Sequence, residues 1–189
     1  MKNEHKKTAL WIALLVLIEQ GIKIFISTFM MDARFTIVPG IFAFETTQNV
    51  HLGWLWSMLD FMMPLWGAVL ISVTTIVFFL LVYRYLKHHA IDAAFSKWTD
   101  RMLIFIMAGA ICKLLDDIFW GGSLDYIMFF EWFIFDLKDA YLTAIALPIF
   151  VYLQIVMDLP YLKLSKAERK AFKKKRSVLT WIKNGMPMA

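Results

Sequence analysis

Four long apolar runs, separated by polar segments, dominate the pattern of hydrophobic positions in this chain. They extend from Thr8 to Met30, from Phe61 to Tyr83, from Met102 to about Leu115, and from Ala140 to Leu159. A bilayer core about 30 Å thick requires roughly 20 apolar residues per helix, and the third run is the shortest of the four. The pattern predicts a membrane protein of the all-α class with four transmembrane helices.

Lysine and arginine are distributed unevenly among the segments that flank these runs. Residues 1–10 contain three, 31–60 one, 84–101 four, 119–138 one, and the residues after Pro160 nine. Rich and poor segments alternate along the chain, and positively charged segments remain in the cytoplasm. Both termini and the middle loop are therefore predicted to be cytoplasmic, which is an N-in/C-in topology.

The overall composition agrees with a lipid environment. Hydrophobic residues make up 60% of the chain and charged residues 19%, which leaves too little polar surface for a water-soluble domain. The net charge of +5 comes mostly from the last segment, so it indicates anionic lipid headgroups as a partner and not nucleic acid. Cys112 is the single cysteine, which excludes an intrachain disulfide and any CxxC metal or redox motif.

The segment at 31–60 has a different character from the apolar runs. It contains Pro39 and Gly40, and the stretches Phe35–Val38 and Ile41–Phe44 are rich in β-prone residues. We expect short strands here, so that the extracytoplasmic surface carries a small β-containing segment.

The basic residues near the end divide the chain into a membrane domain at 1–160 and a cytoplasmic tail at 161–189. From Lys163 to Arg176 they recur at helical spacing around apolar residues such as Phe172. One interpretation is a cationic surface helix lying against the inner leaflet. The other is a disordered basic tail that only enforces the topology.

Two ionisable residues lie in the middle of the first apolar run. Glu19 and Lys23 are four residues apart, a spacing that places opposite charges on one face of a helix. Charged groups within a membrane span are costly, so they pair with one another or serve a function. The pair is either an internal ion pair that makes the helix insertable or a support for an active site.

Four carboxylates lie near the outer ends of the last two runs. Asp116 and Asp117 end the third run, and Asp136 and Asp139 precede the fourth. Two carboxylates that share one proton are what aspartic-type hydrolysis requires. The alternative is that these acids lie at helix ends because such ends are wet and a helix N-terminus favours negative charge.

The order of the motifs resembles lipoprotein signal peptidase, the type II signal peptidase of bacteria, from about Leu17 to Leu147. Glu19-Gln-Gly-Ile-Lys23 resembles the family's acid-Gln-x-x-Lys pattern. Cys112 to Tyr126 resembles Gly-Asn-x-x-Asp-Arg followed by a Gly and an Asp-Phe pair. Phe135-Asp-Leu-Lys-Asp139 resembles Phe-Asn-x-Ala-Asp, and Asn49 begins a faint match to an outer-loop pattern.

The resemblance implies an endopeptidase of the bacterial cytoplasmic membrane that cuts diacylglyceryl-modified prolipoproteins just before the lipid-modified cysteine. Its catalytic dyad would be Asp116 and Asp139, facing the extracytoplasmic side. We expect no metal, no organic cofactor and a monomer that contacts membrane lipids. Four further residues would shape the substrate-binding site, namely Asn49, Lys113, Asp117 and Asp136.

The sequence departs from the family pattern around this dyad. Lys113 replaces Asn, Asp117 replaces Arg, Asp136 replaces Asn and Lys138 replaces Ala. Lys113 and Asp117 are four residues apart, and Asp136 and Lys138 are close in sequence, so we expect these new charges to neutralise one another across the two helices. They also motivate a first alternative, an inactive homologue that binds lipoprotein precursors or a membrane partner. A second alternative, from another class, is a small transporter or proton relay that uses the charged residues of the spans.

Overall fold

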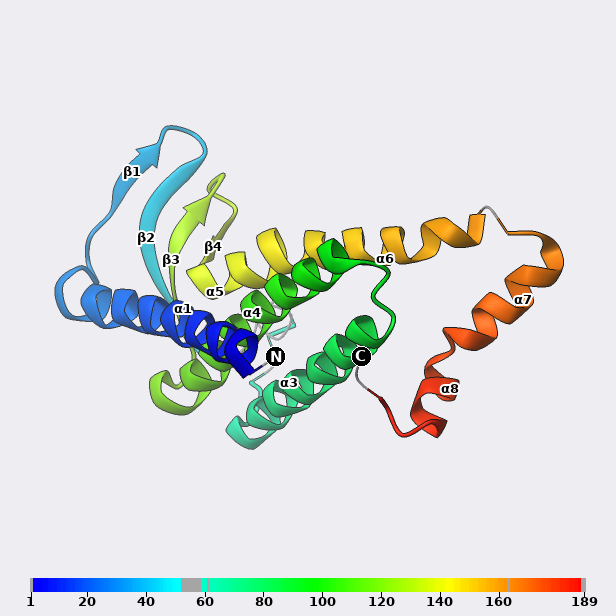
Figure 1. Cartoon of the computed structure of the whole chain (residues 1–189). Coiled ribbons are helices and arrows are strands. Elements are labelled where there is room, and N and C mark those ends of the chain that lie inside the picture. Colours follow the sequence, from blue (N-terminus) through cyan, green and yellow to red (C-terminus); the bar gives the residue numbers. More distant parts are fainter. Residues whose placement is uncertain (1, 52–58, 61, 163, 188–189) are drawn as a thin grey trace.

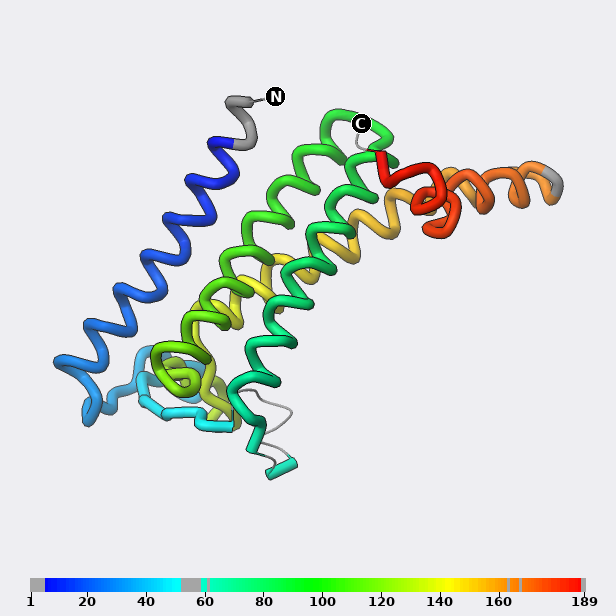
Figure 2. The backbone as a smooth tube through the Cα atoms, turned by 90° about the horizontal axis from the view of Figure 1, so that it is seen from below, coloured from blue at the N-terminus to red at the C-terminus, as the bar shows by residue number. Residues whose placement is uncertain are grey.

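The computed structural model describes residues 2–51, 59–60, 62–162 and 164–187 (Figure 1). Long helices and a small sheet make up the described part of the chain. The main helical elements are α1 (Lys2–Phe29), α3 (Leu65–His88), α4 (Ala93–Leu115), η1 (Asp116–Trp120), α5 (Leu137–Asp139), η2 (Ala140–Ala146) and α6 (Leu147–Leu162). Helices α1, α3 and α4 run side by side, as Figure 2 shows from below.

Three helical segments are long and apolar enough to cross a membrane. They are Lys6–Phe29, Leu65–His88 and Leu137–Leu162, and at most 22% of the most apolar window of each is buried within the protein. Their apolar side chains therefore face outward, as contact with lipid requires. The first, second and fourth apolar runs overlap these segments, which confirms three of the predicted helices. The second helix begins at Leu65, and the predicted start at Phe61 lies outside the described residues.

Helix α4 contains the third apolar run and is the most enclosed of the long helices. Met102, Ile106 and Cys112 are buried in it, and it contacts α1, α3 and η2. Helix α4 is not among the three segments that are apolar enough to cross a membrane, because it contains charged residues such as Asp100 and Lys113. A count of four spans and their orientation therefore stay predictions.

The middle loop expected at residues 84–101 is mostly helical. Helix α3 continues to His88, and α4 begins at Ala93 because the side chain of Asp92 accepts a hydrogen bond of 2.6 Å from the backbone N–H of Phe95. Lys87 also forms an ion pair of 3.0 Å with Asp100 across the turn. These local bonds shorten the loop to a tight connection.

A close approach between α4 and η2 holds the ends of the last two helical segments together. A Cβ atom on Gly109 would lie 2.6 Å from Cγ of Leu142, far inside van der Waals contact. A larger residue at 109 would force the Leu142 side chain to move, so glycine favours the close approach of α4 and η2. The main apolar core lies between the other ends of these helices, around Leu86, Met102 and Leu153.

Four antiparallel strands form one sheet in the order β1-β2-β3-β4 at one end of the helices (Figure 1). The strands are β1 (Phe35–Val38), β2 (Phe42–Asn49), β3 (Ser123–Phe129) and β4 (Phe133–Phe135). The predicted strand at 35–38 is confirmed, and the second is longer than predicted because β2 pairs with β3 along its length. The sheet thus joins two segments that are distant in the sequence.

The basic tail is helical and lies at the opposite end of the molecule from the sheet (Figures 1 and 2). It contains α7 (Lys166–Lys175) and α8 (Val178–Lys183). Ser165 starts α7 through a reciprocal capping box with Glu168, a local signal strong enough to fix the helix start. The helical form of the tail agrees with the first interpretation, whereas its contact with lipid stays a prediction.

Candidate active site

Asp116 lies where α4 changes into a short π-helical turn, η1. The turn ends at Gly121, which has a left-handed backbone with φ 62°. Gly122 follows with φ +148°, and a Cβ atom there would lie 2.4 Å from the carbonyl oxygen of Asn49. Glycine at this position lets β2 and β3 meet, and it turns the chain so that Ser123 returns to the side of Asp116.

Asp136 and Asp139 face one another across the first turn of α5. The backbone N–H of Asp139 donates to Oδ1 of Asp136 at 3.2 Å, and the backbone N–H of Asp136 donates to Oδ2 of Asp139 at 3.5 Å. This capping box fixes both carboxyl groups at the start of the helical segment. The π-helical η2 begins directly after Asp139, and π-helical turns are frequent at functional sites.

Lys23 joins the first helix to both groups of aspartates. Its ammonium nitrogen is fully buried and lies 2.6 Å from Oδ2 of Asp116 and 2.6 Å from Oδ2 of Asp136. Glu19 lies 3.3 Å from the same nitrogen. The expected Glu19–Lys23 pair is therefore part of a larger network, and buried charges of this kind persist only when they are paired.

Lys138 is a second buried cation in the network. Its ammonium nitrogen lies 3.1 Å from Oδ2 of Asp116 and 2.5 Å from Oγ of Ser123, and it also forms an ion pair with Asp136. Asp125 lies slightly farther away, at 3.9 Å. Lys138 thus contacts Asp116, Asp136 and Ser123. The motif that this segment resembles has alanine at this position.

The acids of this cluster outnumber its two lysines. The described cluster contains five acids and two lysines, which are Glu19, Asp116, Asp125, Asp136, Asp139, Lys23 and Lys138. Burial raises the pKa of Asp125 to about 7. Burial acts in the same direction on Asp136, but Lys138 and Lys23 outweigh it and lower the pKa of that carboxyl to about 2. The charge of the site is therefore divided between protonated and ionised acids.

The carboxylate oxygens of three of these acids also lie near enough to one another to be considered as metal ligands. They come from Asp125, Asp136 and Asp139 and lie within 4.8 Å of each other. The ammonium of Lys138 is already in contact with Asp136 and close to Asp125. A lysine ammonium has no lone pair for a metal and supplies the positive charge itself, so this donor set does not fit a cation.

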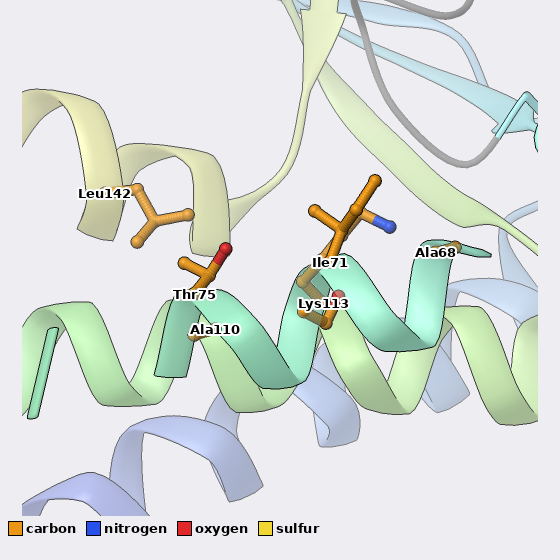
Figure 3. Close-up of a pocket in the computed structure, with 7 residues that line it drawn as sticks. Ala68, Ile71, Thr75, Ala110, Lys113 and Leu142 are labelled. Carbon is orange, nitrogen blue, oxygen red and sulfur yellow. The ribbon is translucent and has the colours of Figure 1, made fainter. Parts of the chain in front are cut away.

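Lys113 and Asp117 form a separate pair beside the network. Lys113 bonds to Oδ1 of Asp117, and the hydroxyl of Ser72 donates to Oδ2 of the same carboxylate at 3.3 Å. The predicted neutralisation of Lys113 by Asp117 is thus present, one helical turn apart. Figure 3 shows Lys113 at a small cavity of about 120 Å³ between α3, α4 and η2, with Ile71 and Leu142 among its walls.

Asn49 lies at the end of β2, opposite Ser123 in the sheet. Its side-chain oxygen is buried and has no hydrogen-bond partner among the described residues. A buried carbonyl oxygen without a donor is unfavourable in a folded protein unless another group supplies one. Asn49 therefore offers an unused acceptor at the end of β2.

Several polar residues of the site were not among the predicted site residues. Gln20 donates to Oδ1 of Asp116 at 3.2 Å, and the hydroxyl of Tyr126 donates to Glu19 at 3.0 Å. Oγ of Ser123 lies 2.6 Å from Oδ1 of Asp125. The signal for Ser123 was its spacing of two from Asp125, which places both on one face of a strand.

Comparison with known proteins gives consistent matches. A family model described as signal peptidase (SPase) II matches residues 11–156. A lipoprotein signal peptidase of Bartonella bacilliformis is 29% identical over 142 residues, which cover 72% of this chain and 80% of that protein. A lipoprotein signal peptidase of Enterococcus faecalis is 28% identical over 118 residues, which cover 61% of this chain and 67% of that protein.

The fold also has solved relatives. A bacterial membrane enzyme determined by the in meso method at 2.3 Å resolution superposes with a TM-score of 0.60 and 21% sequence identity, over 84% of this chain and 90% of that chain. A second bacterial membrane enzyme, determined by the same method at 1.9 Å resolution, has a TM-score of 0.57 and 16% identity, over 79% and 93% of the two chains. The arrangement of helices and sheet is thus one already seen in membrane enzymes.

Proposed function

The chain belongs to the signal peptidase II family, a family of multi-pass membrane proteases, and we propose that it removes signal peptides from lipid-modified prolipoproteins by aspartic catalysis. The observation that carries this proposal is the convergence of Asp116 from η1 and the Asp136–Asp139 turn of α5 on the ammonium of Lys23. Three segments that are separate in the sequence thus bring their charged groups to one buried place.

In this proposal the two catalytic aspartates have different roles, and their contacts support the division. Asp116 accepts from Gln20 and contacts both Lys23 and Lys138, an environment that suits an ionised carboxylate. Asp139 accepts one long backbone bond of 3.5 Å, and within the described residues no cation lies at ion-pair distance from it. In our proposal, Asp116 is the general base and Asp139 carries the shared proton.

The proposed reaction needs one water molecule and no cofactor. Asp116 takes a proton from the water while the water oxygen bonds to the scissile carbonyl carbon, and Asp139 gives its proton to the carbonyl oxygen. The tetrahedral intermediate then collapses, and the C–N bond breaks. The new amine takes the proton from Asp116, and one hydroxyl of the intermediate returns a proton to Asp139, which restores both aspartates.

The surrounding residues have supporting roles in this proposal. The side-chain oxygen of Asn49, which has no partner among the described residues, accepts a backbone N–H of the signal peptide. The Lys113–Asp117 pair forms the wall toward α3. Asp136 holds Lys23 and Lys138 in place. Aromatic side chains such as Phe119 and Trp132 are exposed, and in this proposal they contact the lipid headgroup region.

The proposal includes a membrane arrangement. Helix α4 is the remaining span, which gives four spans with both termini in the cytoplasm and the dyad on the extracytoplasmic side of the bacterial cytoplasmic membrane. Residues 1–160 then form the peptidase domain and 161–189 the cytoplasmic tail, in a monomer surrounded by lipid. The excess of lysine and arginine at the end opposite the sheet supports this orientation.

One observation favours a second function, which is binding of prolipoproteins without cleavage. The ammonium of Lys138 contacts Asp116, where a nucleophilic water would need to approach the carboxylate. Asp136 and Ser123 hold Lys138 in this position, so Asp116 stays in an ion pair with it. A protein with this arrangement recognises a lipidated precursor through the same surface but does not hydrolyse it.

A processing assay distinguishes the two functions. A lipidated prolipoprotein is expressed in bacteria that lack their own type II signal peptidase, and its gel mobility is followed with wild type, Asp116→Asn or Asp139→Asn. Cleavage by wild type alone supports the peptidase and its dyad. Co-purification of uncleaved precursor with all three well-expressed versions overturns it in favour of binding, and cleavage by all three overturns the assigned dyad.

A further inference from the structure

A cleft lies between α6 and the tail. Figure 1 shows the tail at the end of the molecule opposite the sheet. The cleft has a volume of about 640 Å³, and its walls come from α6, the last turn of α7 with the following Arg176, and Tyr85 of α3. Cavities of roughly 300–1,000 Å³ are typical of small-molecule sites. This cleft is separate from every residue of the proposed dyad.

The tail is fixed to the helices around the cleft by specific bonds. The hydroxyl of Tyr85 donates to the backbone carbonyl of Arg176 at 2.7 Å, and the ring of Trp181 packs edge-on against Tyr85 at 5.7 Å. Arg84 donates to the carbonyl of Met186 at 2.8 Å. The cleft is therefore a built feature of the described fold, with walls from both the spans and the tail.

Two cations line the cleft and have bonding capacity left over. The ammonium of Lys173 lies 5.2 Å from the centre of the Tyr161 ring, and no carboxylate pairs with it in the part of the chain that the structure describes. Arg176 bonds to the carbonyl of Met157, which leaves further N–H donors of its guanidinium free for a ligand. Asp158 also lines the cleft, so its three charged side chains sum to +1.

The other walls of the cleft are apolar and continue onto the outer face of α6. Ile155, Leu159 and Leu162 line it, and each side chain is at least half exposed. Such side chains on a membrane-spanning helix face lipid tails. The cations at the mouth of the cleft match the phosphate of a phospholipid at the membrane surface. The apolar wall, which continues toward the membrane interior, matches the acyl chains.

We propose that this cleft binds the headgroup of an anionic phospholipid, with Lys173 and Arg176 contacting the phosphate and the apolar face of α6 lying along the acyl chains. This site goes beyond the proposed peptidase function and does not depend on it. Polybasic segments next to a membrane attract anionic lipids in general. The proposal is narrower, because it assigns binding to the two cations of the cleft and not to the whole charge of α7.

The test uses the full chain, purified in a zwitterionic detergent and titrated with short-chain phosphatidylglycerol while its thermal midpoint is measured. Short-chain phosphatidylcholine and inorganic phosphate are titrated in parallel. The variants are Lys173→Gln, Lys173→Gln with Arg176→Gln, and a control with equal charge loss, Lys174→Gln with Lys175→Gln. Lys174 and Lys175 are exposed on the same helix and do not line the cleft.

We expect phosphatidylglycerol to stabilise the wild type with a saturable curve that the other two ligands do not reproduce. Removal of one interfacial charge should weaken its apparent affinity about fivefold, and the double change in the cleft about 25-fold. The control should weaken it less than twofold. Because Lys173→Gln keeps every bond of Arg176, this single variant still tests the site if the double variant unfolds.

Three results would overturn the site. Equal weakening by the cleft variants and by the control would mean diffuse attraction to α7. Equal stabilisation by phosphatidylcholine would remove the role of the headgroup charge. Full stabilisation by inorganic phosphate would leave a small-anion site without a lipid.

Discussion

The ammonium nitrogen of Lys138 lies 3.1 Å from Oδ2 of Asp116, so a cation from α5 touches one of the two aspartates proposed to be catalytic. Lys138 also bonds to Asp136 and Ser123, so the contact belongs to a buried network and not to a flexible surface pair. In the related motif this position is alanine. The interaction is therefore the feature of this chain that bears most directly on its reaction.

Lys138→Ala should increase cleavage of a prolipoprotein about tenfold, because water then reaches Asp116 without a competing ammonium, which corresponds to about 1.4 kcal/mol of activation free energy. The measurement is the initial rate of precursor processing at matched protein levels. Lys138→Arg keeps the cation and should leave the rate no higher than wild type. An unchanged or lower rate for the alanine variant would mean that Lys138 supports the site.

Lys23→Met should destabilise the protein by about 3–5 kcal/mol, because it removes one of the two buried cations that Asp116 and Asp136 share. Chemical unfolding in detergent micelles, followed by circular dichroism, measures this loss. Lys6→Met, on the exposed part of the same helix, is the matched control and should stay within about 0.5 kcal/mol of wild type. Equal stability of the two variants would contradict the network.

Asp125 should make stability depend on pH. Burial raises its pKa to about 7, above its ordinary value near 4, so the folded state binds a proton that the unfolded state has released between these values. The contribution of this residue is fully present below about pH 4 and is lost as the pH rises to about 7. Thermal midpoints measured from pH 4 to pH 8 should fall through this window in the wild type.

Asp125→Asn is the control for that pH dependence. Asparagine keeps the size of the side chain and the hydrogen bond with Ser123 but has no titrating proton. Its thermal midpoint should change less across the same window than that of the wild type. Identical slopes for the two proteins would assign the dependence to other acids.

Gly122→Ala should destabilise the sheet by about 2 kcal/mol or more, since its added Cβ would lie 2.4 Å from the carbonyl of Asn49 and its φ of +148° is unfavourable for alanine. Processing activity should fall with it, because this turn returns Ser123 to Asp116. Gly21→Ala is the matched control, since nothing lies within 4 Å of its added Cβ and helices favour alanine. A tolerated change at Gly122 would show that β2 and β3 separate easily.

Features that follow from local pattern were predictable from the chain alone. Apolar runs of sufficient length gave the three helices now seen at Lys6–Phe29, Leu65–His88 and Leu137–Leu162, because helix length and lipid contact depend on nearby residues only. The strand at Phe35–Val38 and the Glu19–Lys23 pair also depend on spacing within a few positions. The family was also predictable, because each of its motifs is a short pattern of neighbouring residues.

The arrangement of charges in the site was not predictable in this way. Local spacing correctly paired Lys113 with Asp117, but it gave no reason for Lys23 to join Asp116 with Asp136, or for Ser123 to lie beside Lys138. Those contacts join residues far apart in the sequence. They depend on how close packing brings the helix ends and the sheet together, with the Leu142 side chain against Gly109 and the backbone of Asn49 against Gly122. A pattern of residue types along one chain does not contain those distances.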